Sequence, residues 1–338
     1  MKPNLITIGS CTLDCLINIK DTLRFELFEE EEVKKYTAIE YSKKLNIKNL
    51  KFLPGGSAAN IASDCAMLGL NAAYIGKIGK DFSAKMCIDD LESRNVNLSH
   101  MKQTDKKKTA FSVILKSGWG KDRSILAYKG ANDLVTPEEI DEDFFSDVKA
   151  FAWTSLTKEN SCKAVEKCIH LTKDVGGTVF AAPSMSIIKN NPDWAKKLIS
   201  QSDVVSLNKD EAEEITGKRS KMEMINFFIE QGVDLISITD GDDGSVVSDG
   251  KTVFNNSVYE TDIKDTTGAG DAFMSGIILS KFHDFSLEKT CKFASAISSF
   301  EASELGVREG IPGDFDVIDD FIANHSLKII KSNFEDPS

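Results

Sequence analysis

The nine residues from Asp265 to Phe273, Asp-Thr-Thr-Gly-Ala-Gly-Asp-Ala-Phe, are the part of this chain best suited to chemistry on a phosphate. An apolar run at 272–279 follows and predicts a buried helix, so the amides of residues 268–270 would lie at its N-terminus. Unpaired N–H groups there form an anion site. Asp271 would be repelled by a resting phosphate, but it suits a base beside a phosphoryl group in transfer. The alternative is a tight turn followed by an ordinary first-turn acid.

A second stretch suited to binding begins at Gly55 and Gly56, before a helix predicted for residues 57–68. Two glycines let the backbone hinge or approach a ligand closely. The amide of Asn60, in the first turn, can donate to and accept from neighbouring hydroxyl groups. The alternative is a glycine turn followed by an asparagine that caps the helix. Asp14, at the end of the first strand, is by itself only an acid in a loop.

A third set of polar residues follows two apolar strands. Asn208 and Glu211 come directly after the first of them, which places their side chains at a carboxyl end of a sheet, where open α/β folds bind ligands. Their spacing is also that of a helix capping box, and both roles can hold at once. Thr239, Gly241 and Gly244 follow the second strand, and they would by themselves indicate only a turn.

The elements that must position these residues alternate regularly along the chain. After a first buried strand at 5–9, the apolar patterns predict strands at 72–75, 150–154, 178–181, 203–207 and 235–239 and helices at 82–93, 160–173, 192–199, 209–216 and 222–231. Such alternation implies right-handed crossovers and a parallel sheet covered by helices on both faces. The sequence therefore predicts an α/β fold.

A polar, acidic insertion separates the first strand from the helix at 57. It contains Glu29 to Glu32 and ends in an alternating segment at 45–52, which is typical of strands with one face in solvent. We expect a small sheet with a mobile acidic loop, formed by about 15–54 and by part of 109–130. In the second part, residues 111–115 and 124–128 indicate a hairpin around 117–120.

Composition excludes several classes of protein. The 338 residues are 41% hydrophobic and 28% charged, without a Pro- or Gly-rich linker, which favours one large folded domain. A net charge of −12 with no basic stripe argues against a nucleic-acid partner. No apolar run approaches a membrane span and no signal peptide is evident, so we expect no membrane partner. Seven cysteines without paired spacing favour a cytoplasmic location.

The two glycine-containing stretches together resemble the signatures of the ribokinase-like (PfkB) carbohydrate kinases. The resemblance covers about 4–325, so we expect a kinase domain at 1–330 and a tail at 331–338. It implies a three-layer α/β/α sandwich with a small β-sheet lid. It also implies a catalytic base, Asp271, with an anion hole made by Gly268, Ala269 and Gly270. The other implied roles are substrate binding by Asp14, Gly55, Gly56 and Asn60, nucleotide binding by Asn208, Thr239, Gly241, Gly244 and Thr267, and organisation of Mg²⁺ through water by Glu211.

The activity implied by the resemblance is transfer of a phosphoryl group from ATP to a hydroxymethyl group of a sugar or nucleoside. Mg²⁺ would assist, a monovalent cation such as K⁺ is a further candidate, and a homodimer could form through lid strands. Ribokinases carry a lysine at the position of Ser57 and a glutamate near Leu156, so ribose is not favoured. An adenosine-type nucleoside kinase and a non-catalytic sugar sensor stay open as alternatives. A nicotinamide dehydrogenase is disfavoured because the first strand is followed by the single Gly9.

Overall fold

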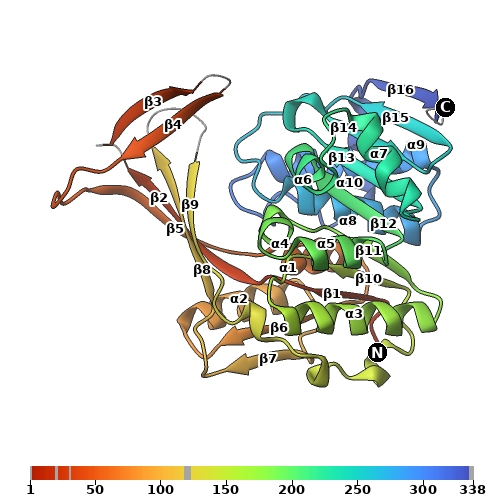
Figure 1. Cartoon of the computed structure of the whole chain (residues 1–338), viewed down its shortest axis with the longest axis horizontal. Coiled ribbons are helices and arrows are strands. Elements are labelled where there is room, and N and C mark those ends of the chain that lie inside the picture. The colour runs from red at the N-terminus through yellow and green to blue at the C-terminus, as the bar shows by residue number, and fades with distance from the viewer. Residues whose placement is uncertain (1, 20–21, 30–31, 118–122, 335–338) are drawn as a thin grey trace.

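The computed structural model describes residues 2–19, 22–29, 32–117 and 123–334, and its main body is built on one ten-stranded sheet (Figure 1). The order across the sheet is β16 (Ile329–Asn333), β15 (Thr252–Asn256), β14 (Ser245–Ser248), β13 (Leu235–Thr239), β12 (Val204–Asn208), β11 (Thr178–Ala181), β10 (Ala150–Trp153), β1 (Leu5–Ile8), β6 (Ala72–Gly79) and β7 (Met101–Thr104). The seven strands from β13 to β7 in this order run parallel, and β14, β15 and β16 complete the sheet in antiparallel pairing. Continuous apolar runs such as Leu-Ile-Thr-Ile in β1 fit strands that are buried on both faces.

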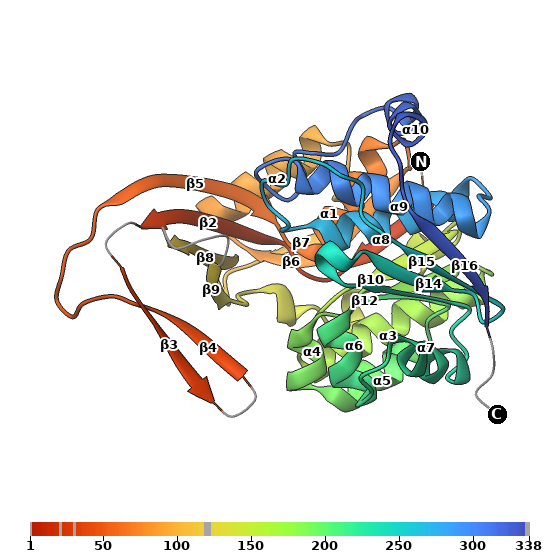
Figure 2. The same ribbon diagram turned by 90° about the horizontal axis from the view of Figure 1, so that it is seen from above.

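Helices cover both faces of this sheet (Figure 2). One face carries α1 (Ser57–Met67), α2 (Phe82–Ser93), α8 (Ala269–Phe282), α9 (Leu287–Ala302) and α10 (Phe315–Asn324). The other carries α3 (Glu159–Asp174), α4 (Met185–Asn190), α5 (Pro192–Ile199), α6 (Lys209–Thr216) and α7 (Lys221–Glu230). A separate cluster of buried apolar side chains fills each interface between helices and sheet. The three-layer α/β/α arrangement expected from the sequence is confirmed.

A small sheet, which we call the lid, projects from one end of the body (Figure 1). Its order is β5 (Ile47–Gly55), β2 (Thr12–Ile19), β8 (Ala110–Ser117) and β9 (Arg123–Tyr128). Beyond it, β3 (Leu23–Glu29) and β4 (Glu32–Ala38) form a hairpin whose strands, within the described residues, pair only with each other. Strand β5 leads directly into α1 through Gly55 and Gly56, so the lid is joined to the body where the second glycine stretch lies.

The fold corrects several sequence expectations. Residues 331–333 belong to β16 and pair with β15, so they continue the main sheet and are not part of a tail. Helix α4 was not predicted, because its six residues are too short to show a helical period. Residues 23–29 and 32–38 form the strands of a hairpin, within the stretch of about 15–54 where a small sheet with an acidic loop was expected. Residues 30–31 of the acidic run and residues 118–120 of the expected turn at 117–120 lie outside the described residues.

None of the helices within the described ranges has the combination of length and apolar character that a bilayer crossing needs.

Candidate active site

Three adjoining cavities follow the carboxyl ends of the parallel strands. The first, which we call the lid-side cavity, has a volume of about 300 Å³ and lies between the lid and the body, lined by residues that include Asp14, Gly56, Asn60, Phe111 and Lys129. The second, the outer cavity, has a volume of about 310 Å³ and lies beside β13, α8 and α9. The third, the junction cavity, has a volume of about 170 Å³ and shares Gly268 and Asp271 with the lid-side cavity and Asn208 and Gly270 with the outer one. The arrangement offers room for two ligands that meet in the middle.

The N-terminus of α8 lies at this meeting point. Gly268 caps the helix with φ of 85°, a left-handed conformation that suits glycine, and a Cβ there would come within 3.1 Å of the Val307 backbone. The first amides of a helix have no acceptor within the helix. The Ala269 amide donates to the Thr266 carbonyl at 3.4 Å, and Gly270 presents its N–H at the start of α8. These residues line the outer cavity, and Gly270 also lines the junction cavity. The sequence-predicted anion site is therefore in contact with open space.

Asp271, in the first turn of α8, faces both the lid-side and the junction cavities. Its Oδ2 accepts a hydrogen bond of 2.7 Å from Nδ2 of Asn60. Burial raises the pKa of Asp271 above the ordinary aspartate value, while hydrogen bonds from Asn60 and Ser57 and the charge of Arg308 oppose that rise. Asp271 is thus a stronger base than an exposed aspartate, and it points toward both ligand spaces.

The lid-side cavity brings together three of the four residues predicted to bind substrate. Asp14 is hydrogen-bonded to the hydroxyl of Ser112, and burial raises the pKa of the Asp14 carboxyl. Gly56 has φ of 100°, and a Cβ there would lie 2.5 Å from the carbonyl oxygen of Ser10, so a side chain would not fit. Asn60 is buried and lines the cavity. Gly55 is not among the described lining residues, because its carbonyl turns away and accepts a hydrogen bond from Arg308.

Asn208 and Glu211 form the capping box that their spacing predicted. The Asn208 side chain accepts from the Glu211 amide at 2.9 Å, and the Glu211 carboxylate accepts from the Asn208 amide at 3.0 Å and from the Met185 amide at 3.1 Å. Both residues line the junction cavity. Burial, with the nearby charges of Asp271 and Asp210, raises the pKa of Glu211. The cap therefore holds an acidic group at the edge of the site.

The outer cavity combines small polar residues with an apolar wall. Thr239, Gly241 and Gly244 line it as predicted, and further lining side chains include Val258, Tyr259, Ile263 and Phe273. Thr267, which we had grouped with them, lines the lid-side cavity instead, and its hydroxyl donates to Asp265 at 2.6 Å. An apolar wall beside glycine turns suits a flat ring attached to a polar chain.

Three residues of the site were missed at the sequence level: Ser112, which contacts Asp14; Lys129, in the lid-side cavity; and Arg308, which contacts Asn60. Each is brought to the site by a long-range contact, and no local spacing marks it.

No group of three or more His, Cys, Asp or Glu side chains able to hold a metal ion directly is found within the described residues. The seven cysteines are free and buried. Asp271 and Glu211 nevertheless both line the junction cavity, where their negative charges face a common space.

Comparison with known proteins gives a consistent result. The model of the pfkB family carbohydrate kinases matches residues 30–313. A 5-dehydro-2-deoxygluconokinase of Listeria innocua is 31% identical over 288 residues, covering 80% of this chain and 86% of the relative. An ATP-dependent 6-phosphofructokinase of Thermoanaerobacterium thermosaccharolyticum is 27% identical over 271 residues, covering 78% and 83%.

Two solved structures share the fold. A ribokinase of Arabidopsis thaliana, complexed with ribose and ATP, superposes with a TM-score of 0.77 at 21% identity, covering 95% of this chain and 99% of the other. A protein of Escherichia coli assigned as a ribokinase II, in complex with ATP and Mg²⁺, superposes with a TM-score of 0.80 at 19% identity, covering 96% and 100%. The expected fold class, including the small separate sheet, agrees with these structures.

Proposed function

This chain belongs to the pfkB family of carbohydrate kinases, and we propose that it transfers the γ-phosphoryl group of ATP to a hydroxymethyl group of a sugar held in the lid-side cavity. The observation that supports this most directly is the position of Asp271 and the N-terminus of α8. They lie where the lid-side and outer cavities meet through the junction cavity. A phosphoryl group that moves from one ligand to the other must pass this point.

Each participant has a distinct task in the proposed reaction. Asp271 accepts the proton of the attacking hydroxyl as the new bond from substrate oxygen to phosphorus forms. The bond between the γ-phosphorus and the bridging oxygen breaks, and ADP leaves. The amides of Gly268, Ala269 and Gly270 stabilise the charge on the transferred group. Asp14, Gly56 and Asn60 orient the substrate, and Asn208, Thr239, Gly241 and Gly244 face the nucleotide.

The acidic pair at the junction cavity fits a magnesium ion that arrives with the nucleotide. Glu211 and Asp271 line the same cavity, and the charge of Asp271 contributes to the raised pKa of Glu211. A cation in this cavity would offset this repulsion, and Glu211 could hold it through water. When bound, Mg²⁺ would neutralise charge on the phosphates.

Dependence on K⁺ stays a prediction. A comparison of turnover in KCl with turnover in choline chloride tests it.

Lys129 supports a sugar that carries a carboxylate or a phosphate. Among the described residues it is the one cationic side chain that lines the lid-side cavity. Its ammonium group donates to the Ser186 hydroxyl at 3.1 Å. The side chain is exposed, but partial desolvation by the surrounding protein lowers its pKa, and the charge of Asp133 opposes that shift. An anionic group on the substrate would pair with this ammonium group. The names of the relatives from Listeria and Thermoanaerobacterium indicate anionic substrates for those enzymes.

The decisive experiment measures ADP release with matched pairs of neutral and anionic acceptors. The panel pairs fructose with fructose 6-phosphate and ribose with ribose 1-phosphate, and adds 5-dehydro-2-deoxygluconate and adenosine. We expect one anionic sugar to stimulate ADP release far above the acceptor-free rate. Lys129→Met should raise the KM for that sugar about tenfold or more, whereas the exposed Lys107→Met should not. Stimulation by adenosine alone would favour the nucleoside kinase, and binding of a sugar without ADP release would favour a sensor.

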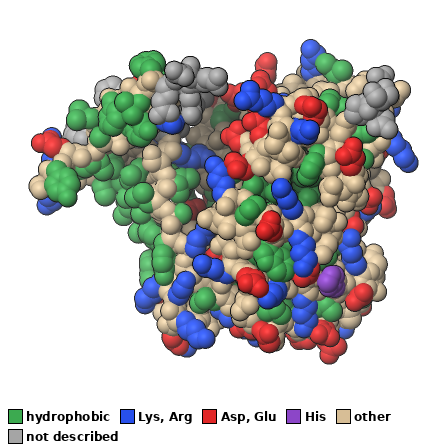
Figure 3. Space-filling view, in the orientation of Figure 1, with side chains coloured by type: hydrophobic (Ala, Val, Ile, Leu, Met, Phe, Trp, Pro, Cys, Tyr) green, Lys and Arg blue, Asp and Glu red, His purple; other side chains and the backbone are tan. Residues whose placement is uncertain are grey.

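The lid offers a surface that a second copy of the chain could cover. Apolar side chains are exposed on the β3–β4 hairpin, where Leu23 is 68% and Phe28 is 78% exposed, and also on the lid sheet, where Leu126 is 62% exposed. Hydrophobic side chains are visible over this part of the molecule in Figure 3. A two-stranded hairpin is marginally stable alone, which supports a homodimer through the lid. Light scattering of the parent and of Phe28→Glu tests this, since only the parent should be dimeric.

A cytoplasmic location is also proposed, on the ground that all seven cysteines are free and buried. Fractionation of the cells that produce the protein tests it.

A further inference from the structure

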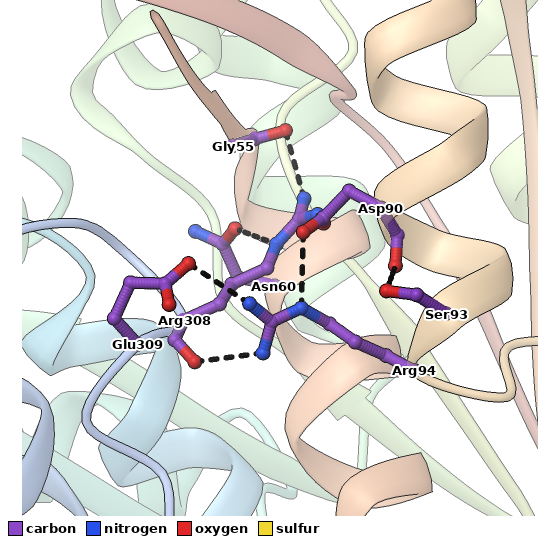
Figure 4. Close-up of polar contacts among 7 residues, drawn as sticks. All are labelled: Gly55, Asn60, Asp90, Ser93, Arg94, Arg308 and Glu309. Carbon is purple, nitrogen blue, oxygen red and sulfur yellow. Dashed lines mark hydrogen bonds and ion pairs between the residues drawn. The ribbon is translucent and has the colours of Figure 1, made fainter. Parts of the chain in front are cut away.

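Arg308 is a buried arginine that contacts three separate parts of the molecule (Figure 4). It lies in the segment between α9 and α10, and its side chain is only 1% exposed. Its Nε donates to Oδ1 of Asn60 at 2.8 Å, and its Nη2 donates to the carbonyl oxygen of Gly55 at 3.0 Å. Its Nη1 forms an ion pair with the carboxylate of Asp90 in α2. Its partner Asn60 lines the lid-side cavity, whereas Arg308 itself is not among the lining residues described for any of the three cavities.

The contact with Asn60 determines which end of that amide faces the catalytic base. A guanidinium can only donate, so the Asn60 group beside Arg308 must be the carbonyl oxygen. The Asn60 NH₂ group is thereby directed to Asp271, where it donates to Oδ2 at 2.7 Å. If the Asn60 amide turned over, its oxygen would face a carboxylate oxygen of Asp271, and the two oxygens would repel each other. Arg308 therefore fixes the orientation of the residue that holds Asp271.

The contact with Gly55 ties the same guanidinium to the lid. Gly55 is the last residue of β5, and α1, which carries Asn60, begins two residues later. One planar group thus joins the end of a lid strand to the hydrogen bond that orients the base. The separation along the chain is large, since Arg308 and Gly55 are 253 positions apart.

A second arginine shares a partner with Arg308 but does not contact the site. Arg94, the residue after α2, donates from Nε to Asp90 at 3.1 Å and from Nη1 to the backbone carbonyl of Arg308 at 2.9 Å, and its Nη2 contacts Glu309 at 3.0 Å (Figure 4). Asp90 is therefore shared by both guanidinium groups, which balances the buried charge of Arg308. Arg94 serves as a matched control, because it shares this ion pair but makes none of the described contacts with Asn60 or Gly55.

We propose that Arg308 is a positioning residue for phosphoryl transfer, which orients the Asn60 amide toward Asp271 and fixes the end of the lid strand β5 beside it. The inference rests on the proposed kinase function. Two effects should follow from loss of the guanidinium. The base is no longer held in one geometry, and misplacement of a reacting group by about 1 Å can cost about 10²-fold in rate.

The second effect is electrostatic. The charged groups near Asp271 come from several elements: Arg308 from the segment after α9, Glu211 from α6 and Asp64 from α1, with Asp14 and Lys129 lining the same lid-side cavity. Arg308 is the cation whose charge lowers the pKa of Asp271 against the effect of burial. Without it, Asp271 should retain its proton to higher pH, and the acid limb of the kcat profile should move to higher pH.

The test compares Arg308→Gln, Arg308→Lys and Arg94→Gln with the parent. We expect Arg308→Gln to lower kcat about 10²-fold with an upward shift of the acid limb, and the Kd for ATP to stay within about twofold of the parent. Arg308→Lys keeps the charge, but an ammonium group cannot donate to the acceptors on Asn60, Gly55 and Asp90 with the planar geometry of a guanidinium. We therefore expect kcat to fall while the acid limb of the kcat profile stays at the same pH. Arg94→Gln should lower the melting temperature without moving the limb. A limb that shifts equally in Arg94→Gln, or a kcat of Arg308→Gln within twofold of the parent, would overturn the proposal.

A crystal structure of Arg308→Gln, or of Arg308→Lys if the former does not fold, gives a reading that does not depend on turnover. We expect the hydrogen bond from Asn60 to Asp271 to be lost or the Asn60 amide to be turned over. An unchanged Asn60 in that crystal structure contradicts positioning. Absence of ADP release by the parent with every acceptor contradicts the kinase function instead, so the two failures are separable.

Discussion

Replacing Asp271 with asparagine separates a catalytic base from a structural acid. The substitution keeps the size of the side chain, and an asparagine oxygen can still accept the 2.7 Å hydrogen bond from Asn60. It removes the ability to accept a proton from the attacking hydroxyl. Loss of a general base usually costs about 10²–10⁴-fold in rate, which corresponds to about 3–5 kcal/mol in the barrier.

The cost in stability should be much smaller. An acid in the first turn of a helix contributes about 0.3–1 kcal/mol through the helix dipole. Burial disfavours the charged form of Asp271, as its raised pKa indicates, so a neutral side chain regains part of that loss. The melting temperature should therefore change by no more than about 4 °C. Affinity for ATP should be equal or higher, because a negative charge beside the phosphates is removed.

The assay is ADP release at saturating substrate, with ATP binding measured by calorimetry and unfolding followed by circular dichroism. Asp316→Asn provides the matched control, since Asp316 is also a first-turn acid, on α10, and it lines none of the three cavities as described. We expect the control to retain full turnover. A kcat of Asp271→Asn within tenfold of the parent would refute the assignment of Asp271 as the base.

Three further outcomes are expected. Asp14→Ala should raise the KM for the sugar far more than the KM for ATP, because the loss of a polar contact weakens sugar binding by about 1–3 kcal/mol. Steady-state kinetics with each substrate varied in turn measures both constants. A rise in the KM for ATP alone would mean that the two cavities were misassigned. Hydrogen exchange in residues 17–54 should slow when sugar is bound, because the lid has few buried anchors, and equal exchange in both states argues against closure. The free energy of unfolding should fall as pH rises from about 5 to 8, because burial raises the pKa of Asp64 to about 7 and that of Glu301 to about 8. Groups whose folded pKa exceeds the unfolded one stabilise the protein at low pH and lose that contribution as pH rises through the folded pKa. Urea unfolding at both pH values measures the slope, which should be smaller in Asp64→Asn.

The features predicted correctly from the sequence are those encoded within a few residues. Helix α6 begins as expected because Asn208 and Glu211, three positions apart, cap each other's backbone. The helix α8 was recognised because a glycine turn and an apolar run are adjacent in the chain. Parallel strands such as β1 and β10 were recognised because burial on both faces requires continuous apolar runs. In each case the physical cause and its sequence signal are local.

The sequence left other features unresolved, for different reasons. Arg308 and Asn60 are 248 positions apart, and no periodic pattern indicates which of the basic residues will meet that amide. The β3–β4 hairpin was obscured by acidic residues, although Leu23, Phe25 and Leu27 alternate with polar ones as strands require. The assignment of Thr267 to the nucleotide stays a prediction, since its hydroxyl donates to Asp265 and the residue lines the lid-side cavity.

The environment of Asp271 shows why such distant contacts matter for the reaction. Burial alone would raise the pKa of this carboxyl, so that the resting enzyme would hold the proton it must later accept. Asn60 and Arg308 act in the opposite direction, the first by donating to the carboxylate and the second by its charge. A useful base needs both influences, since a carboxylate with too low a pKa accepts a proton poorly. In the proposed mechanism, the signature around Asp271 supplies the base, and α1 and the segment after α9 adjust its basicity. The hydrogen bond from Arg308 to Gly55 would make that adjustment depend on the position of the lid strand β5.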